Sequence, residues 1–185
     1  RSGKTFSFAI SILHRVMTTA NYKVMVVTPY DVQAAEIFNT IRDLVNLLGE
    51  TWGEYKDIIK RDIKGSPNHL MQFANGSRIR GFTTGSSGAG PVRGQGAHLI
   101  VLDEVDYMTE SDLDSILAIL ADNADIELWM ASTPKGKLIL HKMEQIATYK
   151  SFHFPSFVLP HYNDDLDADF KNQLTPTGYV QEVMA

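Results

Sequence analysis

The chain has 185 residues, 44% of them hydrophobic, and a formal net charge of −5. This length and composition predict one domain with a single sizeable core. The acidic balance argues against a protein that binds nucleic acid over its whole surface, and the lack of cysteine excludes disulfides and thiolate metal sites. With no signal peptide and no apolar run long enough to cross a bilayer, the sequence predicts a cytoplasmic protein with no membrane partner.

Residues 1–5, Arg-Ser-Gly-Lys-Thr, match the second half of the phosphate-binding loop G-x-x-x-x-G-K-[ST]. In such a loop the backbone N–H groups and Lys4 would hold the phosphates of a nucleotide, and the Thr5 hydroxyl would hold Mg²⁺. An ordinary helix start with a lysine in its first turn would give the same residues. The strand and first glycine of the motif would lie before residue 1, so we expect the chain to be a fragment of a longer protein.

Helices are predicted throughout the chain. The first would follow the loop directly, on apolar positions at helical spacing, which are Phe6, Ile10, Leu13, Val16 and Met17. Asp31 is placed to cap a second helix that Gly49 ends, and Thr109 with Asp112 resembles a capping box at the start of a third. A fourth is expected near residues 138–147.

Strands are predicted between these helices at the short apolar runs 23–28, 98–102 and 126–131, and a further strand is predicted at 151–154. Asn75-Gly76, between two further runs, predicts a hairpin. Strands that alternate with helices indicate a mostly parallel α/β sheet with helices on both faces.

Two segments have no such pattern. Residues 52–68 are polar and contain a basic stretch from Lys56 to Lys64, for which we expect a solvated face, with contact to DNA as the alternative. Residues 83–96 are rich in glycine and serine and predict a mobile loop. Arg78 and Arg80 on the hairpin are expected to be surface residues, and the six histidines show no metal-ligand spacing.

An apolar strand that ends in Asp103 and Glu104 carries the second chemical feature. Asp103 would hold Mg²⁺ directly or through water, and Glu104 would polarise a water for attack on the γ-phosphate. Two surface acids at a strand end would be the plain alternative, but that interpretation does not explain the four apolar residues before them.

Ser132-Thr133-Pro134 follows the next strand, at the carboxyl edge where open α/β sheets bind ligands. A hydroxyl there could contact the γ-phosphate or the attacking water, although a simple turn would have the same residues. Phosphoryl transfer also needs a positive charge. Arg1 could supply it within its own subunit and Arg93 to a neighbour's nucleotide, or both could be solvated loop residues.

Taken together, these segments resemble the ATPase domain of the large terminase subunit, the genome-packaging motor of tailed bacteriophages. The similar segments are residues 1–5, 26–30, 75–79, 92–96, 99–106 and 131–136. The resemblance implies a P-loop NTPase of the RecA/ASCE-like class, a three-layer sandwich with a mostly parallel sheet and a truncated N-terminal strand.

By the same resemblance, the cofactors are ATP and Mg²⁺. The nucleotide would contact Ser2, Gly3, Lys4, Thr5, Ser132 and Thr133. Thr5 and Asp103 would hold the metal, and Glu104, Arg93 and Arg1 would be the catalytic residues.

The resemblance also implies partners and domain limits. Double-stranded DNA, a portal, a small terminase subunit and a homo-oligomeric ring are expected, in an infected bacterial cell or encoded by a prophage. Residues 1–160 would be the ATPase core, and the acidic, then helical residues 161–185 would lead toward a nuclease domain beyond Ala185, so no nuclease activity is expected of this chain.

Two other functions fit parts of the sequence. One RecA-like lobe of a superfamily 2 DNA helicase would also account for Gly3-Lys4-Thr5, Thr28-Pro29 and the Asp-Glu-Val-Asp run at 103–106. A non-catalytic DNA-binding or scaffold module with a degenerate nucleotide site is the other. The scaffold module does not explain why the phosphate loop, the acid pair at 103–104 and the segment 132–134 all carry residues competent for catalysis.

Overall fold

The structure is a computed structural model that describes residues 3–65, 69–84, 96–122, 125–136 and 138–184. Its strands are β1 (Lys23–Thr28), β2 (Ile59–Ile63), β3 (His69–Phe73), β4 (Arg78–Thr83), β5 (Leu99–Asp103) and β6 (Glu127–Ala131). Its α-helices are α1 (Lys4–Thr18), α2 (Asp31–Thr51), α3 (Glu110–Asp122), α4 (Ile139–Glu144), α5 (Asp164–Gln173) and α6 (Pro176–Tyr179).

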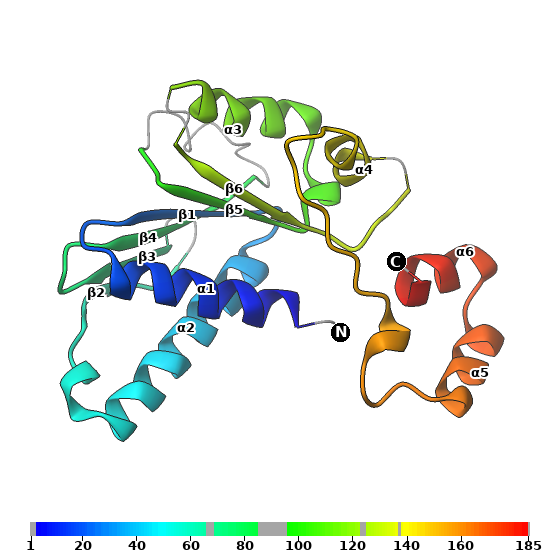
Figure 1. Ribbon diagram of the computed structural model, residues 1–185, viewed down its shortest axis with the longest axis horizontal. Helices are drawn as coiled ribbons and strands as arrows, with labels where there is room; N and C mark the ends of the chain where they lie inside the picture. Colours follow the sequence, from blue (N-terminus) through cyan, green and yellow to red (C-terminus); the bar gives the residue numbers. More distant parts are fainter. Residues whose placement is uncertain (1–2, 66–68, 85–95, 123–124, 137, 185) are drawn as a thin grey trace.

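The six strands form one sheet in the order β2-β3-β4-β1-β5-β6. The pairs β4–β1, β1–β5 and β5–β6 are parallel, whereas β2–β3 and β3–β4 are antiparallel. Helices α1 and α2 lie against one face of this sheet and α3 lies over the other (Figure 1). The mostly parallel, three-layer P-loop fold predicted from the sequence is confirmed.

Successive side chains of a strand point to opposite faces, so the sheet separates two apolar clusters. In β1, Val24 and Val26 pack in the cluster that includes residues of α1 and α2. Met25 and Val27 pack in the other cluster, with residues of α3 and α4. Full burial on both sides explains why this strand is a continuous apolar run, and β5 is buried along its whole length in the same way.

The parallel strands β1, β5 and β6 end at the same edge of the sheet, and α1 begins there. The first strand was predicted with its correct bounds, the strand predicted at 98–102 lies one residue further along as β5, and the strand predicted at 126–131 is β6. The hairpin is also confirmed, with β3 and β4 joined through Asn75 and Gly76, and Gly76 has a φ of 83° that favours glycine.

Two predictions about the ends of α2 were wrong. Asp31 does not cap α2, because the N-cap is Tyr30 and Asp31 is the first helical residue. Its Oδ1 instead lies 2.8 Å from Nε2 of the buried His69 on β3. Gly49 does not end α2 either. The helix continues to Thr51, since a glycine within a helix costs only about 1 kcal/mol.

The polar segment 52–68 contains β2, a strand that the sequence pattern did not predict. Lys60 and Arg61 lie on this exposed edge strand, and Asp62 holds Arg42 of α2 in a two-pronged ion pair at 2.6 and 2.8 Å. Residues 151–154, expected to be a strand, have no strand pairing. Phe152 and Phe154 alternate with the polar Ser151 and His153, but they are 76% and 61% exposed and are not buried in the sheet.

The face of α1 that contacts the core was predicted in part. Of the predicted apolar positions, Leu13 and Val16 are buried and Met17 packs against the same cluster. Phe6 and Ile10 remain 53% and 44% exposed, and the other buried residues are Ala9 and Ile12.

The tail is helical, as predicted. Asn163 caps α5 by accepting a hydrogen bond from the N–H of Leu166. A π-helix, η5 (Val180–Met184), follows α6 and returns toward the sheet, with Val183 buried and the Ser156 hydroxyl donating to the carbonyl of Glu182. Across the described ranges, no helix is both long and apolar enough to cross a membrane. The expected boundary at residue 160 stays a prediction.

Candidate nucleotide site

Lys4 is the first residue of α1, and its ammonium group lies at the carboxyl edge of the sheet. Its Nζ is 3.4 Å from Oε1 of Glu104 and donates a hydrogen bond to the Thr133 hydroxyl over 3.3 Å. Lys4 therefore contacts two residues that lie 100 and 129 positions further along the chain. Gly3 precedes it with a φ of 70°, a conformation that glycine adopts at little cost.

Glu104 is held from several sides. Its Oε2 accepts hydrogen bonds from the N–H of Thr133 at 3.2 Å and from the Ser132 hydroxyl at 3.3 Å. Its backbone is left-handed, with φ 54° and ψ 48°, which is uncommon for a residue with a side chain. Glu104 keeps this conformation at the point where β5 ends, and it lines the same pocket as Asp103.

Asp103 is the last residue of β5, and only 4% of its surface is exposed. Burial, followed by the charge of Glu104, raises the pKa of the Asp103 carboxyl from 3.8 to about 6, against the opposing effect of Lys4. The carboxylate also accepts a hydrogen bond from the N–H of Glu104. A buried carboxylate with so little cationic compensation is suited to a cation.

Asp106 organises the loop after β6. Its carboxylate accepts hydrogen bonds from the backbone N–H of Lys135 at 3.2 Å and of Leu140 at 2.8 Å, and its own N–H donates to the Ser132 hydroxyl. Lys135 lies over the ring of Tyr107, 3.3 Å from its centre. The segment that follows Ser132-Thr133-Pro134 is therefore tied to the turn that carries Glu104.

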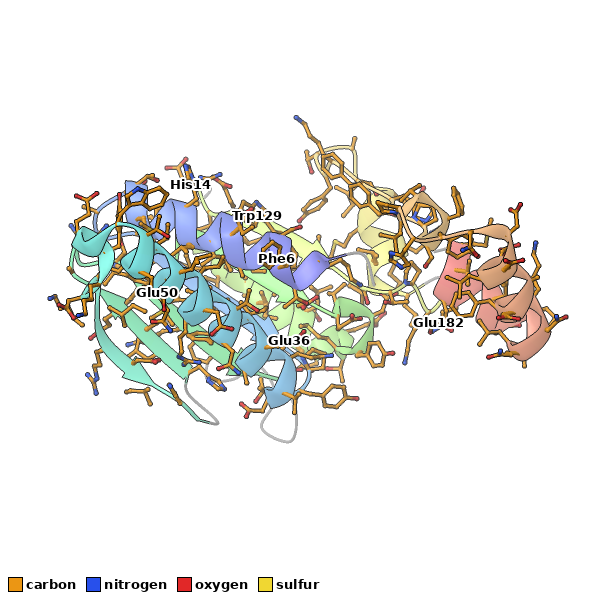
Figure 2. The ribbon with its side chains drawn as sticks, turned by 90° about the horizontal axis from the view of Figure 1, so that it is seen from below. Phe6, His14, Glu36, Glu50, Trp129 and Glu182 are labelled. Atoms are coloured by element: carbon orange, nitrogen blue, oxygen red, sulfur yellow. The ribbon has the colours of Figure 1, made fainter. Side chains whose placement is uncertain are left out.

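The predicted site residues in the described chain line a pocket of about 630 Å³; they are Gly3, Lys4, Thr5, Asp103, Glu104, Ser132 and Thr133. The phosphate-loop residues and the two acids form one side of the pocket, and α2 contributes Gln33, Glu36 and Thr40. Figure 2 shows Glu36 on α2, Phe6 at the first turn of α1 and Glu182 near the C-terminal end. Phe6 and Glu182 also line the pocket, so the tail closes part of its rim. The volume is sufficient for a nucleotide, since ligand pockets typically measure about 300–1,000 Å³.

The donor set fits Mg²⁺ bound together with a nucleotide. In the described part of the chain, no group of three or more His, Cys, Asp or Glu side chains could hold a metal ion. Mg²⁺ at a nucleotide site takes only one or two protein ligands and completes its octahedron with phosphates and water. Thr5 and the buried Asp103 both line the pocket and can provide them.

The structure thus brings together six residues that the sequence singled out, which are Gly3, Lys4, Asp103, Glu104, Ser132 and Thr133, and places Thr5 in the same pocket. Arg1, Ser2 and Arg93 lie outside the described residues. Sequence reasoning missed Gln33 and Glu36 on α2, and gave Asp106 no role. The first two are three residues apart on a helix that starts after a strand predicted to end at the ligand edge, and that spacing could have identified them.

Comparison with known proteins agrees with this geometry. Residues 2–140 match the family model of the DEAD/DEAH box helicases. No curated protein sequence matches the chain.

Among solved structures, the large terminase ATPase domain of Thermus phage P74-26 is similar over 100% of this chain and 84% of its own, with a TM-score of 0.78 and 17% identity. The large terminase of a second thermophilic bacteriophage is similar in its complexes with ADP and with ATP-γ-S, with TM-scores of 0.69 and 0.66 and 18% identity. Both of these matches cover 100% of this chain, which in turn spans 45% and 44% of the second phage's terminase chains.

At these identities the likeness establishes the fold, while the family model covers three quarters of the sequence. The chain is a P-loop ATPase and belongs to the DEAD/DEAH box helicase family.

Proposed function

We propose that this ATPase converts hydrolysis into translocation of double-stranded DNA, as the motor domain of a viral genome-packaging terminase. The extent of the structural similarity carries this proposal. The helicase family model ends at residue 140, whereas the likeness to the P74-26 terminase ATPase domain extends over the whole chain, including α5, α6 and η5. A tail shared with terminases favours packaging over unwinding.

The chemistry follows from the pocket. Lys4, freed from Glu104 when nucleotide enters, would bind the β- and γ-phosphates at the N-terminal end of α1, where the helix dipole also favours negative charge. Thr5 and Asp103 would hold Mg²⁺, which neutralises charge on the phosphates. Glu104 would then orient and deprotonate the attacking water.

Hydrolysis would be sensed by Ser132 and Thr133. Both contact Glu104, and Thr133 also contacts Lys4, so loss of the γ-phosphate changes the partners of this loop. Asp106 ties the same loop to α4, which gives a route from the site to the segment that leads into the tail. Arg93 or Arg1 remains the proposed source of the additional positive charge.

A helicase lobe is the second candidate, and the family model favours it. Two assays on the full-length gene product that carries this domain separate the two functions. ATP-dependent uptake of DNA into procapsids, without strand separation of a labelled duplex, is expected. Unwinding of the duplex without packaging would refute the motor and support the helicase.

A further inference from the structure

Two buried side-chain atoms have no hydrogen-bond partner within the described residues, Oε1 of Gln33 and Nδ1 of His69. A buried polar atom without a hydrogen-bond partner destabilises the fold. His69 is the first residue of β3, its ring packs against Phe38, and its other ring nitrogen, Nε2, lies 2.8 Å from Oδ1 of Asp31. Gln33 differs, because it lines the nucleotide pocket. Its oxygen is therefore placed to meet something that binds there.

Helix α2 presents a polar face to this pocket. Gln33, Glu36 and Thr40 are spaced by three and four residues, which puts them on one side of the helix, and all three line the pocket that also contains Asp103. The Thr40 hydroxyl already donates to the Glu36 carbonyl at 2.9 Å. Of this face, the Gln33 oxygen is the acceptor that is buried without a partner among the described residues.

Mg²⁺ keeps several of its waters when it binds a nucleotide, and each water needs acceptors for its protons. Thr5 and Asp103 account for few of these acceptors. An amide oxygen accepts two hydrogen bonds. Unlike a carboxylate, it adds no negative charge to a pocket already lined by the acids Glu36, Asp103, Glu104, Glu144 and Glu182.

We propose that Gln33 is a positioning residue of the metal site, whose side-chain oxygen accepts a hydrogen bond from a water in the hydration shell of nucleotide-bound Mg²⁺. This role rests on the proposed binding of Mg²⁺–nucleotide at Asp103, and not on the proposed movement of DNA. Gln33 thereby helps to fix the metal from α2, which lines the same pocket as Lys4.

The test measures ADP affinity by calorimetry, in saturating Mg²⁺ and in EDTA, for the wild type and for Gln33→Leu. Leucine keeps the size and removes the acceptor. The gain in ADP affinity due to Mg²⁺ is expected to fall about tenfold, as is typical for partners of metal ligands, while affinity in EDTA stays the same. Gln33→Glu keeps an acceptor and is expected to retain most of the gain.

Thermal denaturation of the nucleotide-free protein provides the second readout. Because leucine removes an unpartnered oxygen, Gln33→Leu is expected to be at least as stable as the wild type, so misfolding would not explain a loss. Thr40→Val, on the same helix face with its hydroxyl already bonded, is the matched control and is expected to keep the full Mg²⁺ effect.

The possible outcomes separate the two proposals. An unchanged Mg²⁺ effect in Gln33→Leu would overturn the role of Gln33 alone. A wild type whose ADP affinity does not respond to Mg²⁺ would remove the metal site itself, and with it this inference. Equal losses in Thr40→Val and Gln33→Leu would show a general disturbance of α2 and would also overturn the assignment.

Discussion

Glu104 combines a left-handed backbone with contacts to three residues of the site. Such a conformation costs on the order of 1–3 kcal/mol and persists where surrounding contacts hold it. Here the contacts from Lys4, Ser132 and Thr133 do so. Their convergence on one carboxylate is what an ATPase needs, because a base must lie beside the γ-phosphate and respond to its loss.

Replacing Glu104 with glutamine separates binding from catalysis. The amide keeps the size and one acceptor oxygen but cannot take a proton, so we expect ATP hydrolysis to fall by at least about 100-fold. ATP binding should be retained. Steady-state phosphate release and equilibrium ATP binding test both expectations, and turnover equal to that of the wild type would exclude Glu104 as the base.

Asp103 predicts a specific dependence of stability on pH. Its pKa is raised by burial to about 6, above the ordinary 3.8, so its ionised form destabilises the nucleotide-free fold. The cost is absent below about pH 3.8, grows between the two pKa values and is complete above about 6. At full ionisation it amounts to roughly 3 kcal/mol.

Asp103→Asn should therefore stabilise the nucleotide-free protein at pH 8, and the gain should shrink as the pH falls to 5. Asparagine still accepts the Glu104 N–H, which keeps the local geometry. Urea denaturation of both proteins at the two pH values measures the difference in free energy of unfolding. A gain that is the same at pH 5 and pH 8 would mean that the Asp103 charge is not its source.

At the scale of elements, α3 illustrates a local signal that tertiary structure left intact. Thr109 and Asp112 form the predicted capping box, since the Thr109 hydroxyl accepts from the Asp112 N–H while the Asp112 carboxylate accepts from the Thr109 N–H. The two residues are neighbours in sequence, so no distant contact is needed to form these bonds.

Thr109→Ala should lower the free energy of unfolding by about 1 kcal/mol, because an orphan N–H at the helix start loses its partner. ATP hydrolysis should be unchanged, as neither capping residue lines the nucleotide pocket. Chemical denaturation measures the loss. Thr51→Ala is the control, since that hydroxyl bonds only its own helix, at Leu47, and its removal should cost less than about 0.5 kcal/mol.

Two segments were predicted wrongly from the sequence, and each has a physical reason. Strand β2 is an exposed edge strand, rich in charge, and lacks the burial that produces an apolar pattern. Residues 151–154 show the reverse, because Phe152 and Phe154 line the pocket walls without entering the sheet. An alternating pattern indicates that one side of an extended segment is apolar, and does not show what that side contacts.

At the scale of the molecule, the tail is an appendage linked to the site. Gln181 and Glu182 line the pocket, and no residue of α5 or α6 does. These two helices lie to the side of the sheet (Figure 1). Asp167 connects these two helices, accepting hydrogen bonds from the hydroxyls of Tyr162 and Tyr179 at 2.5 Å and pairing with Lys171 at 2.6 Å. The bond from Lys171, together with the tyrosines, lowers the pKa of Asp167 to about 2.

Asp167→Ala should loosen the tail selectively. We expect faster amide hydrogen exchange in α5 and α6, and unchanged protection in β1 and β5, which are buried at the centre of the sheet. In the wild type the same loosening should begin as the pH falls below about 4 toward 2, since the contribution of a carboxylate with a lowered pKa is present above its ordinary value and lost below it. Equal exchange in both proteins would show that Asp167 does not hold the tail.

The amino-acid sequence by itself determined the buried strands, the capping box and the hairpin, and it singled out Lys4, Asp103 and Glu104, which the structure places in one pocket. Each of these depends on neighbours in the chain or on burial of a whole segment, so local pattern suffices. Only the tertiary structure decided which face of α1 is buried, that Asp31 meets His69, and that Gln33, a residue of the pocket lining, has a buried oxygen without a partner. Those outcomes depend on residues dozens of positions away, whose approach no local periodicity encodes.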